Sequence, residues 1–444
     1  MDKQKLYSKR FLDSLNSEIK EWQEEQIIDD KQAATLHSRY AGLARPASQN
    51  KLIRILTILG VLLVGAGVIL FFASHWDGIS NPVKVGLIIT SLLISYALGY
   101  FWRYQPGNMP ILGTAMILLG AIIFGAGVLL ISQIYHLGGK LPEAILIWAI
   151  GSILVAWVTK LIPALALSSI LFSVWSALYY DSYSNPVYYF PAIMALVFLL
   201  TYRYGSPLTA VINILGIIPW LCTLVIASLS DHHGEEDFVY CLITLLAYGV
   251  LVYTVAYLHH LADRITKFAY WFRLVGALII ILTLYILSFG DLLEEIKHNA
   301  EPNQSLLILF ILTFLTIIAW VTISMSKAKD KANIYEKIAA GILLLVCFIT
   351  ISGAHPTFIV NLILFAAIIG IIVMGFFKAE ASFINIGLTA FIINLITRYI
   401  EYGSSMMDRS LFFIGGGIIL LAGGYLLERL RRKLMEKVKQ NEGT

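Results

Sequence analysis

Long apolar runs recur along almost the whole chain, and they constrain its fold more than any other feature. A helix that crosses a bilayer needs about 20 mostly apolar residues, and fourteen runs approach that length. Only 14% of the residues are charged, whereas soluble domains carry about 25%. The sequence therefore predicts an all-α polytopic transmembrane helical bundle with about 14 spans. The expected spans are 53–73, 84–102, 111–132, 143–160, 163–180, 187–202, 206–229, 238–258, 273–289, 305–325, 338–352, 357–377, 381–398 and 410–427.

Basic residues in the short connecting loops predict how these spans are oriented. Lys and Arg are enriched in cytoplasmic loops. With the N-terminus in the cytoplasm, the inner loops and the C-terminal tail hold 17 basic residues, and the outer loops hold five. Both termini are therefore expected in the cytoplasm. The basic loops are expected to contact anionic lipid headgroups, and no nucleic-acid partner is expected because no soluble basic surface is evident.

A polar segment precedes the first apolar run. Its apolar positions recur at helical spacing, which predicts an amphipathic helix, and they are Phe11, Leu15, Ile19 and Trp22. Asp29 and Asp30 can accept hydrogen bonds from the first N–H groups of a second helix, expected over residues 31–40. Residues 6–44 then form a small cytoplasmic helical hairpin. So small a hairpin buries little by itself, so it is expected to pack on the membrane domain, on a second copy or on a protein partner.

An internal repeat helps to divide the chain. Residues 59–82 align with 119–142, and nine of the 24 positions are identical. Since the two segments run in the same direction, they indicate a parallel repeat of a two-span unit. We therefore expect four parts, which are a cytoplasmic hairpin and linker (1–50), a four-span region with the repeat (51–160), the remaining bundle (161–428) and a basic cytoplasmic tail (429–444).

Glycines gather on one face of the repeated spans and again in the last span. Small residues let helix backbones approach closely in lipid, so these glycines are expected to be helix contacts. The functional alternative is a small-residue stripe along a substrate path. The positions are Gly60, Gly65, Gly67, Gly120, Gly125, Gly127, Gly415, Gly416 and Gly417.

Polar residues collect at the expected extracytoplasmic ends of the first, third and thirteenth spans. If these ends converge, they form a pocket suited to a phosphate or sugar headgroup, a metal ion or proton transfer. The alternative is simple anchoring, because Trp and Tyr are common at membrane interfaces. No metal site, cofactor or catalytic residue is assigned. The candidate pocket residues are His75, Trp76, Asp77, Gln133, Tyr135, His136, Arg398, Tyr399 and Glu401.

Several of these residues resemble a known family. Trp22, the turn at 27–29, the motif His75-Trp76-Asp77 and the stretch 133–138 are similar to the bacterial membrane proteins grouped as domain of unknown function 2157. That family often has Asn-Trp-Asp where this chain has His75. The stretches 398–401 and 411–429 are similar to the tail of the same group. The resemblance implies a multi-pass protein of the bacterial inner membrane and supplies no activity.

Three hypotheses for function follow. The first is a transporter or flippase for an amphipathic or lipid-linked envelope substrate. The second is a non-transporting envelope sensor or assembly factor that uses residues 6–44 as a partner surface. The third is an integral membrane enzyme that uses the outer polar residues. No nucleophile elbow or phosphate-binding glycine motif is present, which favours a role without catalysis. The lack of charge near span centres argues against a simple proton-coupled carrier.

Overall fold

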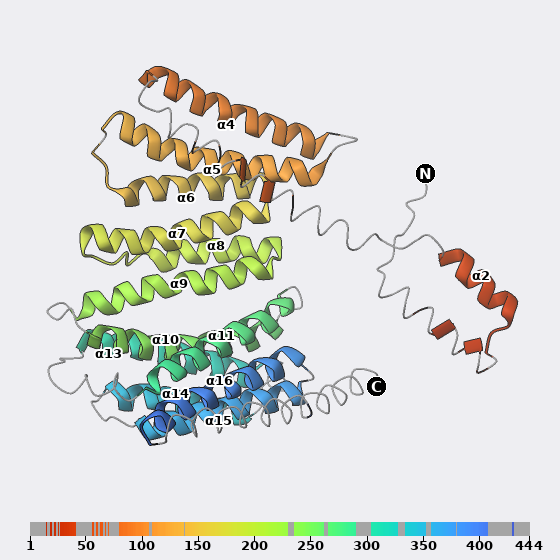
Figure 1. The fold of residues 1–444 in the computed structure, drawn as a ribbon, viewed down its shortest axis with the longest axis vertical. Coiled ribbons are helices and arrows are strands. Elements are labelled where there is room, and N and C mark those ends of the chain that lie inside the picture. Colours follow the sequence, from red (N-terminus) through yellow and green to blue (C-terminus); the bar gives the residue numbers. More distant parts are fainter. Residues whose placement is uncertain are drawn as a thin grey trace. The chain divides into compact units, whose positions relative to one another are not determined.

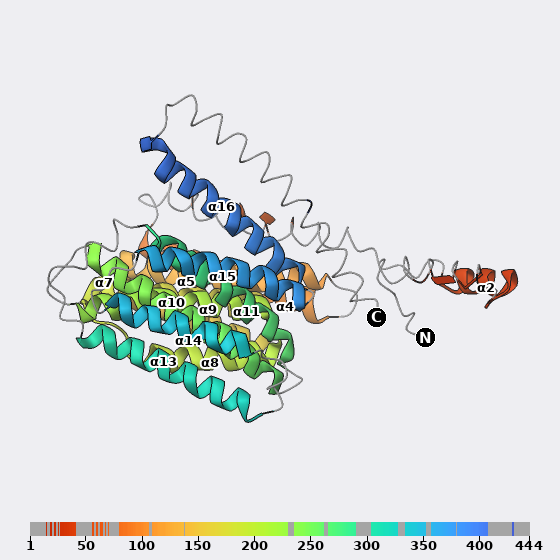
Figure 2. The same cartoon turned by 90° about the horizontal axis from the view of Figure 1, so that it is seen from below.

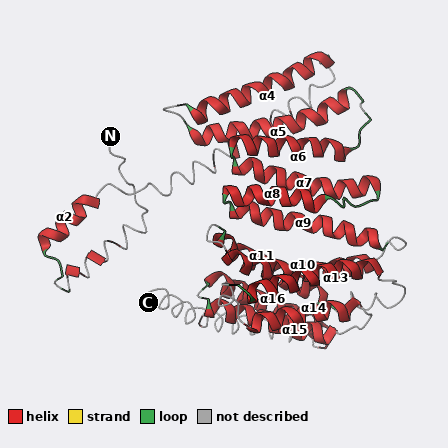
Figure 3. Ribbon diagram, turned by 180° about the vertical axis from the view of Figure 1, so that it is seen from behind, coloured by secondary structure: helices red, strands yellow, loops and turns green. Residues whose placement is uncertain are grey.

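The structure, a computed structural model, is helical throughout the residues that it describes (Figures 1 and 3). Those residues contain thirteen α-helices and no strand. They are 15, 18, 19, 22, 23, 25, 27–40, 56, 59, 60, 63, 64, 67, 70, 80–105, 109–136, 138–229, 235–261, 265–289, 303–326, 334–351, 357–378, 380–406 and 429. They form two compact units, 1–139 and 140–444.

The first unit contains α2 (Asp30–Tyr40), α4 (Asn81–Tyr104) and α5 (Pro110–Ile134). Helix α2 begins as the sequence predicted. The carboxylate of Asp29 accepts from the backbone N–H of Gln32 at 2.6 Å, and the Gln32 side chain accepts from the Asp29 N–H at 3.0 Å. This reciprocal capping box satisfies two N–H groups at the helix start. The first helix of the expected hairpin is described at too few positions to test the hairpin.

Helices α4 and α5 pack closely through small residues. A Cβ atom added at Gly120 would lie 2.7 Å from the Tyr96 ring, and one at Gly127 would lie 2.6 Å from Ile88. The Ser95 hydroxyl donates to the Met116 carbonyl at 2.8 Å across the same interface. Bulkier residues would therefore force the two helices apart.

The remaining glycines that were predicted to be helix contacts are not tested in the same way. No described atom lies within 4 Å of a Cβ built at Gly60 or Gly67, so packing there stays a prediction. Gly125 is buried in α5. Gly65 and the three glycines at 415–417 lie outside the described residues.

The second unit holds the remaining helices. Proline near the start of each of α6 to α9 suits a first turn whose N–H groups have no partner within the helix. The helices are α6 (Leu141–Thr159), α7 (Ile162–Tyr183), α8 (Phe190–Tyr204), α9 (Pro207–Ser228), α10 (Glu235–Leu258), α11 (Thr266–Leu287), α13 (Asn303–Ser324), α14 (Ile334–Ile351), α15 (Thr357–Phe377) and α16 (Ala381–Met406), with a short 3₁₀ helix at His259–Leu261.

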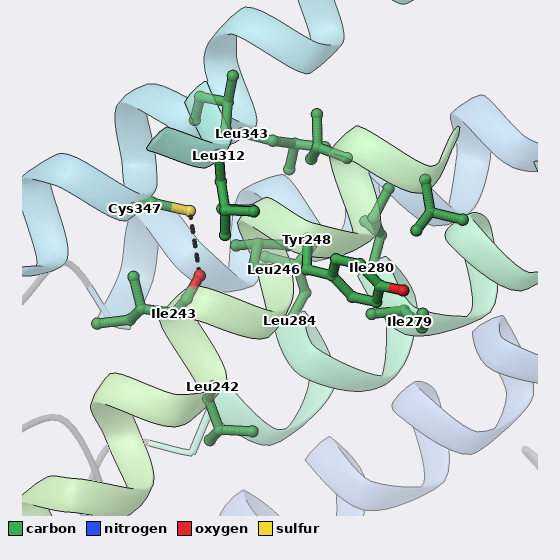
Figure 4. Packing of buried hydrophobic residues seen from close by; sticks show 14 of the residues in the cluster. Leu242, Ile243, Leu246, Tyr248, Ile279, Ile280, Leu284, Leu312, Leu343 and Cys347 are labelled. Carbon is green, nitrogen blue, oxygen red and sulfur yellow. Dashed lines mark hydrogen bonds between the residues drawn. The ribbon is translucent and has the colours of Figure 1, made fainter. Parts of the chain in front are cut away.

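Helix α10 is at the centre of this unit. It packs on α9, α11, α13 and α14, and most of its described side chains are buried. Figure 4 shows Leu246 and Tyr248 of α10 packed against Ile280 and Leu284 of α11. The Cys347 thiol of α14 reaches the Ile243 carbonyl of α10 at 3.7 Å. These contacts fix the positions of the helix ends around α10.

The predicted spans and the described helices agree closely in order. Each expected span from 84–102 to 381–398 coincides with one described helix. Ten of these twelve helices are long and apolar enough to cross a membrane; the other two are α8, a shorter apolar helix of 15 residues, and α14, which has 18 residues and is not among the ten. Span 410–427 lies outside the described residues, and span 53–73 is described at isolated positions. The count of 14 therefore stays a prediction.

One predicted boundary is wrong in a way that matters for the site. The ninth span was expected to begin at residue 273, but α11 begins at Thr266. Arg273 is therefore not a loop residue. It lies in the third turn of α11, where its side chain is 9% exposed. The hydrophobic pattern predicts that the span begins at the charged residue Arg273. The helix includes this residue and the seven before it, because the Arg273 guanidinium is paired with Glu380.

Candidate functional site

A cluster of ionisable side chains is buried at one end of the second unit. Because successive helices alternate in direction, the end of α10, the starts of α11 and α14 and the turn from α15 to α16 all meet there. We call this cluster the Glu336 network. Its members are Tyr253, Tyr257, Arg273, Glu336, Lys378 and Glu380.

Glu336 is the centre of the network. Its side chain is 4% exposed, and its Oε1 atom forms an ion pair with Lys378 Nζ at 3.2 Å. The same oxygen accepts hydrogen bonds from the hydroxyl groups of Tyr253, at 2.9 Å, and of Tyr257. Lys378 Nζ also donates to the Tyr257 hydroxyl at 2.5 Å. One carboxylate oxygen thus holds together side chains from α10, α14 and the end of α15.

A second ion pair adjoins the first. Arg273 of α11 donates through Nη2 to Glu380, which precedes α16. The Arg273 guanidinium also lies 5.7 Å from the centre of the Phe383 ring and 6.0 Å from that of Tyr257. Its Nε atom is buried without a hydrogen-bond partner. The network therefore contains two cations and two anions, and it joins five helices.

The electrostatic setting explains why these charges can be buried. Glu336 lies in the first turn of α14, where the helix dipole favours a negative charge. Burial lowers the pKa of the Lys378 ammonium below its ordinary value, and the Glu336 charge opposes that shift. The two cations and two anions compensate each other, which allows them to be buried together.

A second polar group lies at the opposite ends of α11 and α16. We call it the Arg398 group, and it comprises Tyr285, Ser288, Asn361, Thr397, Arg398 and Glu401. Arg398 donates to Glu401 on its own helix and to the buried Ser288 hydroxyl at the end of α11. The Tyr285 hydroxyl bonds to Thr397 at 2.6 Å. Asn361 of α15 donates to the Ser288 carbonyl at 3.0 Å.

Two of the candidate pocket residues named from the sequence, Arg398 and Glu401, belong to this group and form an ion pair. Tyr399 lies beside them on α16. No sequence signal pointed to Ser288, Thr397 or Asn361, because neutral hydroxyl and amide residues are common throughout the chain.

The other predicted pocket residues belong to the first unit. Gln133, Tyr135 and His136 are exposed at the end of α5, where His136 has a left-handed backbone with φ of 49°. His75, Trp76 and Asp77 lie outside the described residues. A pocket shared by all three groups therefore stays a prediction. Within the described part of the chain, no cluster of three or more His, Cys, Asp or Glu residues could hold a metal ion.

Comparison with known proteins finds a family model that matches the N-terminal third of the chain. Residues 20–165 match the family DUF2157, described as a predicted membrane protein. The resemblance seen in the sequence is confirmed over that range. The DUF2157 match includes α2, α4, α5 and α6, and it ends at the start of α7, so neither the Glu336 network nor the Arg398 group falls within it. No curated protein and no solved structure matches the chain.

The DUF2157 match and the ten candidate spans together identify a membrane protein. No pattern in the sequence pointed to the Glu336 network, although Arg273 and Lys378 are among the 17 basic residues counted on the inner side. The usable signal was a carboxylate, Glu336, two residues before the apolar span expected at 338–352. Its partners are 79 and 83 residues away among the tyrosines of α10, so no local pattern joins them.

Proposed function

We propose that this protein is a transporter or flippase of the bacterial cytoplasmic membrane and that its substrate is amphipathic or lipid-linked. The observation that carries the proposal is the Glu336 network. Burying charges away from water is unfavourable, and buried, paired ionisable residues of this kind cluster at functional sites. A scaffold does not need compensated charges where apolar residues of similar size pack as well or better.

The substrate class follows from the rest of the bundle. Charged residues of the described helices lie toward helix ends, so the middle of the bundle offers little to a fully hydrophilic solute. An open groove of about 470 Å³ lies between α7 and α9. Apolar side chains line most of it, among them Ile170, Val174 and Leu215, which are 41% to 48% exposed. Such a surface accommodates an acyl or prenyl chain while a headgroup crosses beside it.

The proposed orientation has both termini in the cytoplasm, as the 17-to-5 distribution of basic residues supports. The Glu336 network then faces the cytoplasm, and the Arg398 group faces outward. Anionic lipid headgroups contact the basic inner loops. Residues 6–44 bind a protein partner or a second copy of the chain.

Reconstitution tests the proposal directly. Purified protein is placed in liposomes that contain a fluorescent phospholipid or a fluorescent polyprenyl phosphate, and an impermeant reductant bleaches the outer leaflet. If the protein moves lipid between leaflets, the reductant should bleach a much larger fraction of at least one fluorescent probe than the fraction in the outer leaflet. Glu336→Gln should slow that phase, whereas Lys337→Gln, a matched change at the next and more exposed residue, should leave it unchanged. Bleaching that stops at the level of protein-free liposomes for every probe would contradict the proposal.

A further inference from the structure

Helix α16 is joined to its neighbours in different ways at its two ends. Near its start it crosses α15 at very short range. A Cβ added at Gly375 would lie 2.8 Å from the Ile384 backbone nitrogen, and one at Gly387 would collide with Ile372 and lie 3.3 Å from the Ile368 carbonyl oxygen. Backbones this close have no side chain between them. The distance between α15 and α16 is therefore fixed at the crossing, whereas α16 can rotate about that point.

Polar contacts hold the same end onto α11. Tyr270 donates to the Ser382 hydroxyl at 2.7 Å, and Arg273 pairs with Glu380. The ring of Tyr270 also meets that of Phe383, with 6.2 Å between the ring centres. The start of α16 is therefore anchored to α11 and α15 together.

Among the residues that the structure describes, fewer elements contact the far end of α16. Figure 2 shows α16 diverging from α15 with distance from the turn that they share. At that end the contacts to α11 in the Arg398 group are those of Tyr285 with Thr397 and of Arg398 with Ser288. The Arg398 guanidinium also lies 5.0 Å from the Phe289 ring centre. These contacts are polar and lie near a helix end, where water can replace them.

The two sets of contacts are in matching register. Tyr270 and Tyr285 are separated by 15 residues, as are Ser382 and Thr397. With a rise of about 1.5 Å per residue, the two tyrosine hydrogen bonds lie roughly 22 Å apart along the helices. This distance fits within a hydrocarbon layer of about 30 Å, so each set lies near one face of the membrane.

We propose that α16 is the gate helix of the transport path, hinged where it crosses α15 and latched at the far end by the Arg398 group. This inference rests on the proposed function. Opening the latch swings the outer half of α16 away from α11 and α15 and opens a side entrance between them. A lipid-linked substrate suits such an entrance, because its chain stays in the bilayer while its headgroup passes through.

Cysteine labelling tests the latch without any substrate. The three native cysteines (Cys222, Cys241 and Cys347) are replaced by alanine, and Asn394→Cys introduces a reporter. Asn394 is 8% exposed and lies one turn before Thr397 and Arg398 on α16. A membrane-impermeant maleimide is then added to intact cells. With the latch intact, labelling of the reporter should be slow.

The latch variant is Arg398→Gln, and its matched control is Arg273→Gln at the anchored end. Labelling should accelerate roughly tenfold or more in Arg398→Gln, because hydrogen bonds to charged groups each contribute at least that factor to an equilibrium constant. It should stay slow in Arg273→Gln. The exchanged pair Arg398→Glu with Glu401→Arg keeps the ion pair within α16, and a carboxylate at position 398 can accept from the Ser288 hydroxyl of the α11 end, so slow labelling should return.

Several results would overturn the gate. If the Arg398→Gln protein elutes as a folded, monodisperse species and its reporter is still labelled slowly, the Arg398 group is not a latch. Equal acceleration in Arg273→Gln shows general loosening instead of a hinge. If Arg398→Gln does not fold, fast labelling in the exchanged pair would refute the latch. If the wild-type protein bleaches the probe in the liposome assay and any of these labelling results is found, the gate is refuted but the proposed transport function is not.

Discussion

Replacing Glu336 by alanine is expected to destabilise the second unit by breaking a buried ion pair. The substitution removes the carboxylate oxygen that accepts from Tyr253 and Tyr257 and that pairs with Lys378 at 3.2 Å. Two hydroxyl groups and one ammonium lose their shared partner at once. The tyrosines are on α10, the central helix of the unit, so the loss loosens the contact of α14 with the core.

The magnitude follows from burial. Removing one partner of a buried ion pair costs about 3–5 kcal/mol. The Glu336 side chain is 4% exposed, but that of Lys378 is 22% exposed, so the lysine can extend toward water and recover part of its hydration. We therefore expect a loss near the lower limit, about 3 kcal/mol. Glu336→Gln keeps an acceptor for the tyrosines and should lose less, about 1.5–3 kcal/mol for the charge-assisted bond.

The free energy of unfolding is measured by titration with sodium dodecyl sulfate in mixed micelles, followed by tryptophan fluorescence. Lys337→Ala is the matched control, since it removes a charge from the next residue of the same helix turn. Lys337 donates to Ser324 at 2.6 Å in an exposed position, and such contacts contribute about 0–1 kcal/mol. A loss below about 1 kcal/mol in Glu336→Ala, or an equal loss in both variants, would refute the description of the network as a buried structural unit.

Three further predictions concern topology and packing. Reporter fusions at Gly234 and Lys329 should report the outer and inner sides, and the same side for both would mean that the span count between them is wrong. Gly127→Leu should lower stability in detergent by about 1–3 kcal/mol, because a Cβ there would come within 2.6 Å of an α4 side chain; unchanged stability would contradict the close contact of α4 with α5. Asp29→Ala should weaken the start of α2 by about 1 kcal/mol, seen as faster hydrogen exchange there, and unchanged exchange would count against the cap.

The order and approximate length of the spans could be predicted because a bilayer imposes a simple requirement on sequence. An apolar run of about 20 residues must either cross the bilayer or be buried inside the protein. Local signals were equally reliable, as the capping box at Asp29 and Gln32 shows. Boundaries were less predictable. Helix α11 extends seven residues before its expected start because Arg273 finds a partner.

The site could be predicted only where its residues are close in sequence. Arg398 and Glu401 are three residues apart on α16, so a helical prediction places them together. Arg273 and Glu380 are 107 residues apart, and their pairing depends on how α11 meets the α15–α16 turn. Sequence patterns specify which face of a helix is apolar, but they do not specify which helices become neighbours.

The positions of the charges also suggest why the chain keeps them near helix ends. In the middle of the bundle the polar groups are neutral, such as Asn213, whose amide donates to Thr201 at 3.0 Å while its buried carbonyl oxygen lacks a partner. A charge at that depth would have no water to exchange with. Near the ends, an ion pair can open because water or a headgroup replaces the lost partner. Buried pairs in the Glu336 network and the Arg398 group are thus placed where breaking them is feasible, as a helix that moves requires.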